Sequence, residues 1–188
     1  VALAVCAVPG GLLPGGGFDD GAEGWLLEGS GFVSEDGREG ACLAVTGDGE
    51  DSSAWLCPVE LSPGGIYRVT FWARAEGGGG CAVSGPTSVN RDVVPPDRWT
   101  RFSYVVRLPD RPLGGAPDVA GSDRVVFRLG QWHWKGTIWF DDVSLTPVEV
   151  AHVGPGDLGT GESVDGSTYR FRADYGSEGS TYARPLHR

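Results

Sequence analysis

The stretch Gly136-Thr137-Ile138-Trp139-Phe140-Asp141-Asp142-Val143-Ser144-Leu145 decides the fold, because it reads as a β-strand with two carboxylates in its middle. Its apolar side chains change parity at the acidic pair, from Ile138 and Phe140 to Val143 and Leu145. A β-bulge at the pair would produce this change of phase. One carboxylate would then turn inward, where it needs a cation or hydrogen-bond donors.

Further strand patterns precede this stretch and are separated by Gly-rich or Pro-rich turns. In 66–74, Tyr67, Val69, Phe71 and Ala73 alternate with polar side chains and Trp72. Such alternation is typical of antiparallel sheets with one solvated face, so we expect an all-β sandwich. The expected strands are 1–8, 25–27, 41–46, 54–61, 66–74, 81–84, 99–108, 124–129 and 137–145.

The composition limits the class of protein. The chain has 188 residues with 40% hydrophobic residues, enough for one domain with a core. Its 32 Gly and 13 Pro fit many short strands joined by turns. A net charge of -10 argues against nucleic acid as a partner and suits a secreted, extracellular protein.

The cysteines Cys6, Cys42, Cys57 and Cys81 show no C-x-x-C spacing, which argues against a zinc site. In an exported chain they would form one or two disulfides. We favour a Cys42–Cys57 bridge, because the two residues lie in successive expected strands. Four free, buried thiols are the alternative.

The two ends differ in composition from the middle of the chain. The apolar run 1–8 is too short to span a bilayer, and is either the remnant of a signal sequence or a first strand. Residues 148–188 are poor in aliphatic side chains, and form either a linker into a further domain or a tail that donates a strand. We therefore expect a terminal extension at 1–11, a domain at 12–147 and a tail at 148–188. The absence of Met points to a processed chain or a piece of a longer one.

A family resemblance rests on five motifs in order: Gly17-Phe18-Asp19-Asp20-Gly21 with Gly24-Trp25, 41–47, 61–74, Trp99-Thr100-Arg101-Phe102, and Phe140-Asp141-Asp142-Val143-Ser144-Leu145. Over about residues 12–147 the chain resembles the galactose-binding-like jelly-roll carbohydrate-binding modules. Within them it resembles the xylan- and β-glucan-binding type of families 4, 9 and 22. The resemblance implies a jelly-roll β-sandwich, and is more specific for the fold than for the ligand.

The resemblance also implies a structural calcium between the first conserved loop and the last strand. Carried over by motif, its ligands are Asp19, Asp142 and main-chain carbonyls near Gly40, which suit the six to eight oxygens that calcium takes. In the alternative reading, Asp19 caps a turn and Asp141 or Asp142 accepts backbone N–H bonds.

In this family, sugars bind in a groove on the concave sheet or on loops at its edge, by stacking on aromatic rings and bonding to polar side chains. The corresponding candidates here are Trp72, Arg74, Gln131, Trp132 and Trp134. Trp132 and Trp134 share a parity and are expected to face one side. We expect Trp25, Trp55 and Trp139 to lie in the core. We expect Trp99 to pack under a loop and His133 to lie on the surface. The alternative to a binding role for Trp72 is that it caps the edge of the sandwich.

Arginines recur at the solvated parity of the expected strands: Arg68, Arg74, Arg101, Arg107, Arg124 and Arg128. If several converge, an acidic glycan such as a uronate or sulfated polymer would fit them. A solvated face without a ligand is the default reading.

No sequence motif supports catalysis. The chain lacks G-x-S-x-G and H-E-x-x-H, and neighbours such as Asp141 and Asp142 point to opposite faces of a strand. We expect a non-catalytic extracellular module that binds a polysaccharide, with a catalytic domain in the parent chain and no membrane span. The alternative is a structural or adhesive subunit of an extracellular assembly or filament, held by terminal strand exchange between identical subunits.

Overall fold

The computed structural model describes residues 11–78, 80–110, 125–148, 160–162 and 168–170. The chain divides into two compact units, Val1–Pro147 and Val148–Arg188. The described residues are strands, turns and irregular segments without a helix. Accordingly, they hold no helix of the length and apolarity needed to cross a membrane.

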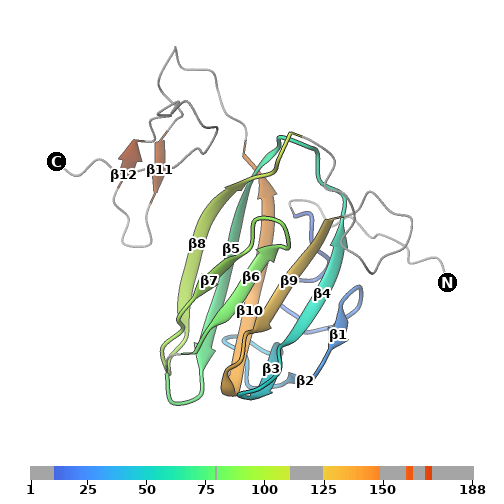
Figure 1. Cartoon of the computed structure of the whole chain (residues 1–188), viewed down its shortest axis with the longest axis vertical. Coiled ribbons are helices and arrows are strands. Elements are labelled where there is room, and N and C mark those ends of the chain that lie inside the picture. The colour runs from blue at the N-terminus through green and yellow to red at the C-terminus, as the bar shows by residue number, and fades with distance from the viewer. Residues whose placement is uncertain (1–10, 79, 111–124, 149–159, 163–167, 171–188) are drawn as a thin grey trace. The chain divides into compact units, whose positions relative to one another are not determined.

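The first unit is built from two antiparallel sheets of five strands each (Figure 1). Sheet A has the order β1 (Leu26–Glu28), β4 (Ser53–Val59), β9 (Val125–Gln131), β6 (Ala82–Pro86) and β7 (Arg91–Val93). Sheet B has the order β2 (Gly31–Ser34), β3 (Cys42–Asp48), β10 (Lys135–Pro147), β5 (Ile66–Ala75) and β8 (Thr100–Arg107). The predicted all-β antiparallel jelly-roll sandwich is thereby confirmed.

The core lies between the inner faces of the two sheets, as the alternating sequence patterns predict. Tyr67, Val69, Phe71 and Ala73 of β5 all belong to one buried cluster. Two side-chain hydrogen bonds join the sheets across this core. Trp55 Nε1 of β4 donates to the Ala44 carbonyl of β3 at 3.0 Å, and the hydroxyls of Ser84 and Tyr104 lie 2.9 Å apart.

The change of apolar phase in β10 is a β-bulge, as predicted. The pairing of β10 with β5 shifts register between Asp141 and Ser144. Asp142 has a φ of 49°, a left-handed conformation that Asp adopts more readily than most residues. The bulge lets apolar side chains of β10 on both sides of the acidic pair reach the core.

The first and last segments of the unit are bonded to each other. The Val143 N–H donates to the Gly16 carbonyl at 2.9 Å, and the Leu12 N–H donates to the Leu145 carbonyl at 3.0 Å. The Phe18 and Trp25 rings then enter the core, where Trp25 meets Phe127 edge-on.

The sequence did not predict the short strands β2 and β7, because neither carries an alternating apolar pattern. The expected strand at 1–8, Arg124 and Cys6 lie outside the described residues. In the second unit, β11 (Thr160–Glu162) and β12 (Thr168–Arg170) pair antiparallel; whether 148–188 is a linker or a donated strand stays a prediction.

Candidate functional site

The outer face of sheet B gathers tryptophan and arginine side chains from three neighbouring strands. Trp139 of β10 pairs with Arg74 of β5, and Trp72 of β5 pairs with Arg101 of β8. Partners in an antiparallel register have their side chains on the same face. We call the outer positions of β5, β8 and β10 that hold Arg68, Trp72, Arg74, Arg101 and Trp139 the arginine–tryptophan face.

Arg74 lies between two indole rings at this face. Its guanidinium carbon is 4.1 Å from the centroid of Trp139 and 5.3 Å from that of Trp99. The Arg74 Nη2 is hydrogen-bonded to the Asp36 carboxylate. The Arg74 Nε is buried without a hydrogen-bond partner. Stacking and the ion pair fix the guanidinium in one place, so the face presents a preorganised set of rings and N–H donors.

A short loop between β2 and β3 approaches the same face. The Arg38 guanidinium carbon lies 4.7 Å from the Trp72 ring centroid, and its Nε donates to Asp142 Oδ2 at 2.8 Å. The Arg38 amide donates to Asp141 Oδ2 at 2.7 Å. The bulge of β10 therefore holds the loop, and the loop places a second guanidinium against an aromatic ring.

One carboxylate of the pair, Asp141, is buried and hydrogen-bonded, as the sequence predicts, but it does not turn into the core: as the register partner of Trp72 it lies on the outer face of sheet B, beneath the loop between β2 and β3. Its side chain is buried, with Oδ2 accepting from Arg38 N and Oδ1 from Asp142 N, each at 2.7 Å. Burial raises the pKa of Asp141 above its ordinary value, and the backbone N–H donors of Arg38 and Asp142 oppose that rise. These amide donors are the hydrogen-bond cluster that a buried carboxylate requires.

The residues predicted to ligate calcium have other partners. Asp19 Oδ1 accepts from the Ala41 amide at 3.0 Å, and Asp142 is ion-paired with Arg38 at 2.8 Å. Among the described residues, no group of three or more His, Cys, Asp or Glu side chains could hold a metal. With a guanidinium already on Asp142, this arrangement does not fit a calcium shell of six to eight oxygens. The resemblance predicts calcium at this site, whereas the side-chain partners of Asp19 and Asp142 predict that none binds.

Calorimetry on protein treated with a chelator tests the calcium prediction. We expect the melting temperature to stay unchanged when calcium is added, because the Arg38 guanidinium occupies the Asp142 carboxylate that calcium would need. Arg38→Ala with and without calcium is the control, since it leaves Asp142 without its cation. A rise in the wild-type melting temperature on calcium addition would contradict the arrangement described here.

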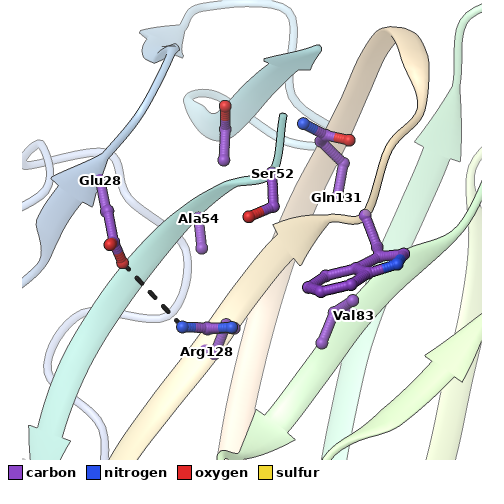
Figure 2. Close-up of a pocket in the computed structure, with 8 residues that line it drawn as sticks. Glu28, Ser52, Ala54, Val83, Arg128 and Gln131 are labelled. Atoms are coloured by element: carbon purple, nitrogen blue, oxygen red, sulfur yellow. Dashed lines mark ion pairs between the residues drawn. The ribbon is translucent and has the colours of Figure 1, made fainter. Parts of the chain in front are cut away.

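The other predicted binding residues lie at sheet A. Gln131 and Trp132 line a small pocket on that sheet, together with Glu28, Ser52, Ser53, Ala54, Val83 and Arg128 (Figure 2). Gln131 is only 2% exposed; its Nε2 donates to the Asp51 carbonyl at 2.9 Å and its Oε1 accepts from the Trp134 amide at 2.7 Å. Gln131 therefore fastens the turn before β10.

Trp132 and Trp134 do not share a surface, so that part of the prediction is wrong. Trp132 is 54% exposed and meets His133 edge-on, whereas Trp134 packs against the core cluster. His133 between them has a φ of 49°, and a residue in the left-handed region breaks the alternation of an extended chain. The two indoles therefore face different surroundings, although they are two residues apart in the sequence.

The favoured disulfide is also wrong, because Cys42 and Cys57 are both free, buried thiols. Cys57 faces the core from sheet A. Cys42 belongs to sheet B and lies outside the core cluster, at the parity opposite Leu43 and Val45. Sheet B therefore lies between the two thiols, which cannot meet to form a disulfide. Burial raises the pKa of Cys42 to about 11 and that of Cys57 to about 12, so both are poor nucleophiles.

The structure adds Trp139, Trp99 and Arg38 to the candidate site. The sequence had not indicated a binding role for any of them. Trp25 and Trp55 are in the core as predicted, but Trp139 is half-buried on the outer face of sheet B. The parity of Ile138 and Phe140, both core residues, is the signal that could have placed Trp139 outside. Trp99 and Arg38 come from loops, for which the sequence holds no comparable periodicity.

Comparison with solved structures places the fold. No family model and no curated protein matches the sequence. The CBM22-1 xylan-binding domain of Paenibacillus barcinonensis Xyn10C superposes with a TM-score of 0.55 at 14% identity, covering 78% of this chain and 100% of that domain. A family 16 carbohydrate-binding module superposes with a TM-score of 0.53 at 20% identity, covering 73% of this chain and 99% of the module.

An enzyme appears among the similar structures as well. The enzymatically active domain of tailspike protein 4 from bacteriophage CBA120 superposes with a TM-score of 0.53 at 11% identity, covering 73% of this chain but 21% of that one. Most of the similar structures are carbohydrate-binding modules. The described sandwich therefore has the jelly-roll fold that carbohydrate-binding modules share.

Proposed function

We propose that this chain is a non-catalytic extracellular module that binds a polysaccharide on the arginine–tryptophan face of sheet B. The observation that carries the proposal is the placement of Trp72, Trp139 and Arg74 on the outer face of one sheet, in a fold shared with carbohydrate-binding modules. Of the two predicted groups of binding residues, we choose the one on sheet B. The group at sheet A offers one exposed indole, because Gln131 and Trp134 are engaged internally.

The chemistry of the face suits sugars. Indole rings stack on the apolar faces of pyranoses, and guanidinium N–H groups donate to hydroxyl oxygens. The strands provide a rigid base, and the ion pairs with Asp36 and Asp142 hold the guanidiniums of Arg74 and Arg38 in place.

The acidic pair of β10 supports binding without catalysis. A glycosidase needs two carboxyl groups that face each other across the scissile bond. Asp141 is buried under amide N–H donors, and Asp142 is ion-paired with Arg38. Neither is placed as a general acid or a nucleophile, and their function is to hold the loop that carries Arg38. The similar structures do not favour the alternative of an assembly subunit.

Affinity electrophoresis and titration calorimetry against a panel of soluble xylans, β-glucans, galactans and pectins test the proposal. We expect the wild-type protein to bind at least one polymer, and Trp72→Ala to weaken that binding by about tenfold or more, a loss of roughly 1.4 kcal/mol. Trp132→Ala is the matched control, because Trp132 is an exposed indole at sheet A.

Two results would count against the proposal. A wild-type protein that binds no polymer of the panel would remove polysaccharide binding altogether. A loss of affinity in Trp132→Ala, with Trp72→Ala unchanged, would move the site to the pocket at sheet A.

A further inference from the structure

Charge is distributed unevenly over the chain. The whole sequence has 25 acidic and 15 basic residues, for a net charge of -10. Strands β5 and β8, which lie side by side in sheet B (Figure 1), contain no acidic residue at all. Their arginines are Arg68, Arg74, Arg101 and Arg107. All of them lie at the parity opposite the core residues, on the outer face of the sheet.

Two of these arginines are already neutralised and two are not. Arg107 is paired with Asp110 at 2.9 Å, and Arg74 is paired with Asp36. Arg68 and Arg101 form no ion pair with any residue that the structure describes. Arg101 is exposed and Arg68 is half-buried. The face therefore presents two unneutralised guanidiniums in a protein that otherwise carries excess negative charge.

The position of Arg101 links this charge to the aromatic part of the face. Arg101 is the register partner of Trp72, so the two side chains lie next to each other on the same face. A sugar ring stacked on Trp72 would bring its exocyclic group within reach of that guanidinium. The hydroxyl-bearing pair Thr70 and Ser103, whose side-chain oxygens are 3.4 Å apart, follows along the two strands.

Arg68 lies beyond this hydroxyl pair, where it offers a second guanidinium to a long ligand. Its register partner is Val105, four positions along β8 from Arg101, which separates the two arginines by roughly 13 Å along the strand direction. A polymer that follows the strands would meet first Arg101 and then Arg68. Because a single small anion cannot reach both, the spacing favours a chain with repeated charges.

We propose that the polysaccharide bound at this face is anionic, and that Arg68 and Arg101 bind carboxylate or sulfate groups on its sugars. This inference rests on the proposed function and names the class of its ligand. Guanidinium groups bind planar carboxylates through two parallel N–H···O bonds, a geometry that an ammonium cannot reproduce. The carboxyl group of a uronic acid would lie beside the Trp72 ring, at Arg101, while a later unit of the polymer meets Arg68.

Titration calorimetry with matched polymer pairs tests this inference. Polygalacturonate is compared with its methyl-esterified form, and dextran sulfate with dextran, each at low and high salt. We expect the charged member of at least one pair to bind about tenfold more tightly, and that preference to fall steeply with added salt. Arg68→Gln with Arg101→Gln should remove the preference without unfolding the protein, since Arg101 is exposed and Arg68 is half-buried on the outer face, away from the core.

Arg107→Gln is the matched control within the same strand. Arg107 lies on the same face, two positions along β8 from Val105, the register partner of Arg68, but its charge is already paired with Asp110. It should keep the preference for the charged polymer.

The outcomes separate the two proposals. Equal binding of the charged and neutral polymers, or an unchanged preference in the double variant, would overturn the anionic ligand and leave polysaccharide binding intact. No binding of any polymer would instead overturn the proposed function itself. A preference confined to dextran sulfate would support an anionic ligand and identify its charge as sulfate.

Discussion

Gly16→Ala is expected to lower the free energy of unfolding by about 3 kcal/mol. A Cβ at Gly16 would lie 2.0 Å from the Val143 carbonyl oxygen and 3.0 Å from its carbonyl carbon, both backbone atoms of the bulged strand β10. Backbone at a bulge cannot move aside as the end of a flexible side chain can. The collision would also break the 2.9 Å hydrogen bond from Val143 N–H to the Gly16 carbonyl.

Gly17→Ala is the control for this prediction. A Cβ at Gly17 meets nothing within 4 Å, so the substitution should leave stability unchanged or raise it by up to about 1 kcal/mol. Urea unfolding followed by tryptophan fluorescence measures both variants. If Gly16→Ala proves as stable as Gly17→Ala, the bond between the first loop and the last strand does not hold the unit together.

Asp141→Ala is expected to cost a similar amount, about 3 kcal/mol, because it removes the acceptor of several buried N–H groups at once. Asp141 accepts from the amides of Arg38 and Asp142, and the backbone of Glu39 also stabilises its charged form. Without the carboxylate, the loop that carries Arg38 onto Trp72 loses its anchor. Polysaccharide affinity should therefore fall together with stability.

Asp142→Asn is the matched control, because it removes the neighbouring charge from an exposed ion pair worth at most about 1 kcal/mol. Asn also tolerates the left-handed conformation at this position. Thermal and urea unfolding of both variants give the comparison. A loss in Asp142→Asn as large as that in Asp141→Ala would show that the ion pair, and not the buried carboxylate, holds the loop.

The pH dependence of the Asp141→Ala difference follows from the direction of the pKa shift. Burial raises the pKa of Asp141 in the folded chain above its ordinary value of 3.8, so the folded state binds this proton more readily than the unfolded state. The contribution of Asp141 to stability therefore grows as the pH falls through the raised pKa toward 3.8. The gap between wild type and Asp141→Ala should widen over that interval.

Those features of the fold that depend on local periodicity were predictable from the sequence. The alternation in β5 and β8 separates core from outer face at each position, and the parity change at Asp141 predicts the bulge. The short strands β2 and β7 were not predictable, because three or four residues carry too little pattern and depend on pairing with β3 and β6.

The candidate site was predictable only in part, since it assembles residues that are distant in sequence. Trp72 and Arg74 follow from the alternation of one strand. Trp139 joins them through the pairing of β10 with β5, and Arg38 through a loop fastened by Asp141. Polarity alone does not distinguish Gln131, whose amide is used inside the fold, from a residue that contacts a ligand. Strand pairing and hydrogen-bond satisfaction are set by tertiary structure.

The place of β10 in sheet B has a consequence for synthesis of the chain. β10 is the last strand of its unit in the sequence, yet it lies in the middle of the sheet, between β3 and β5. On the ribosome, β3 and β5 emerge first and keep unpaired edges until residue 147 has left the exit tunnel. Such late, long-range closure folds slowly and leaves a nascent chain in need of chaperone protection.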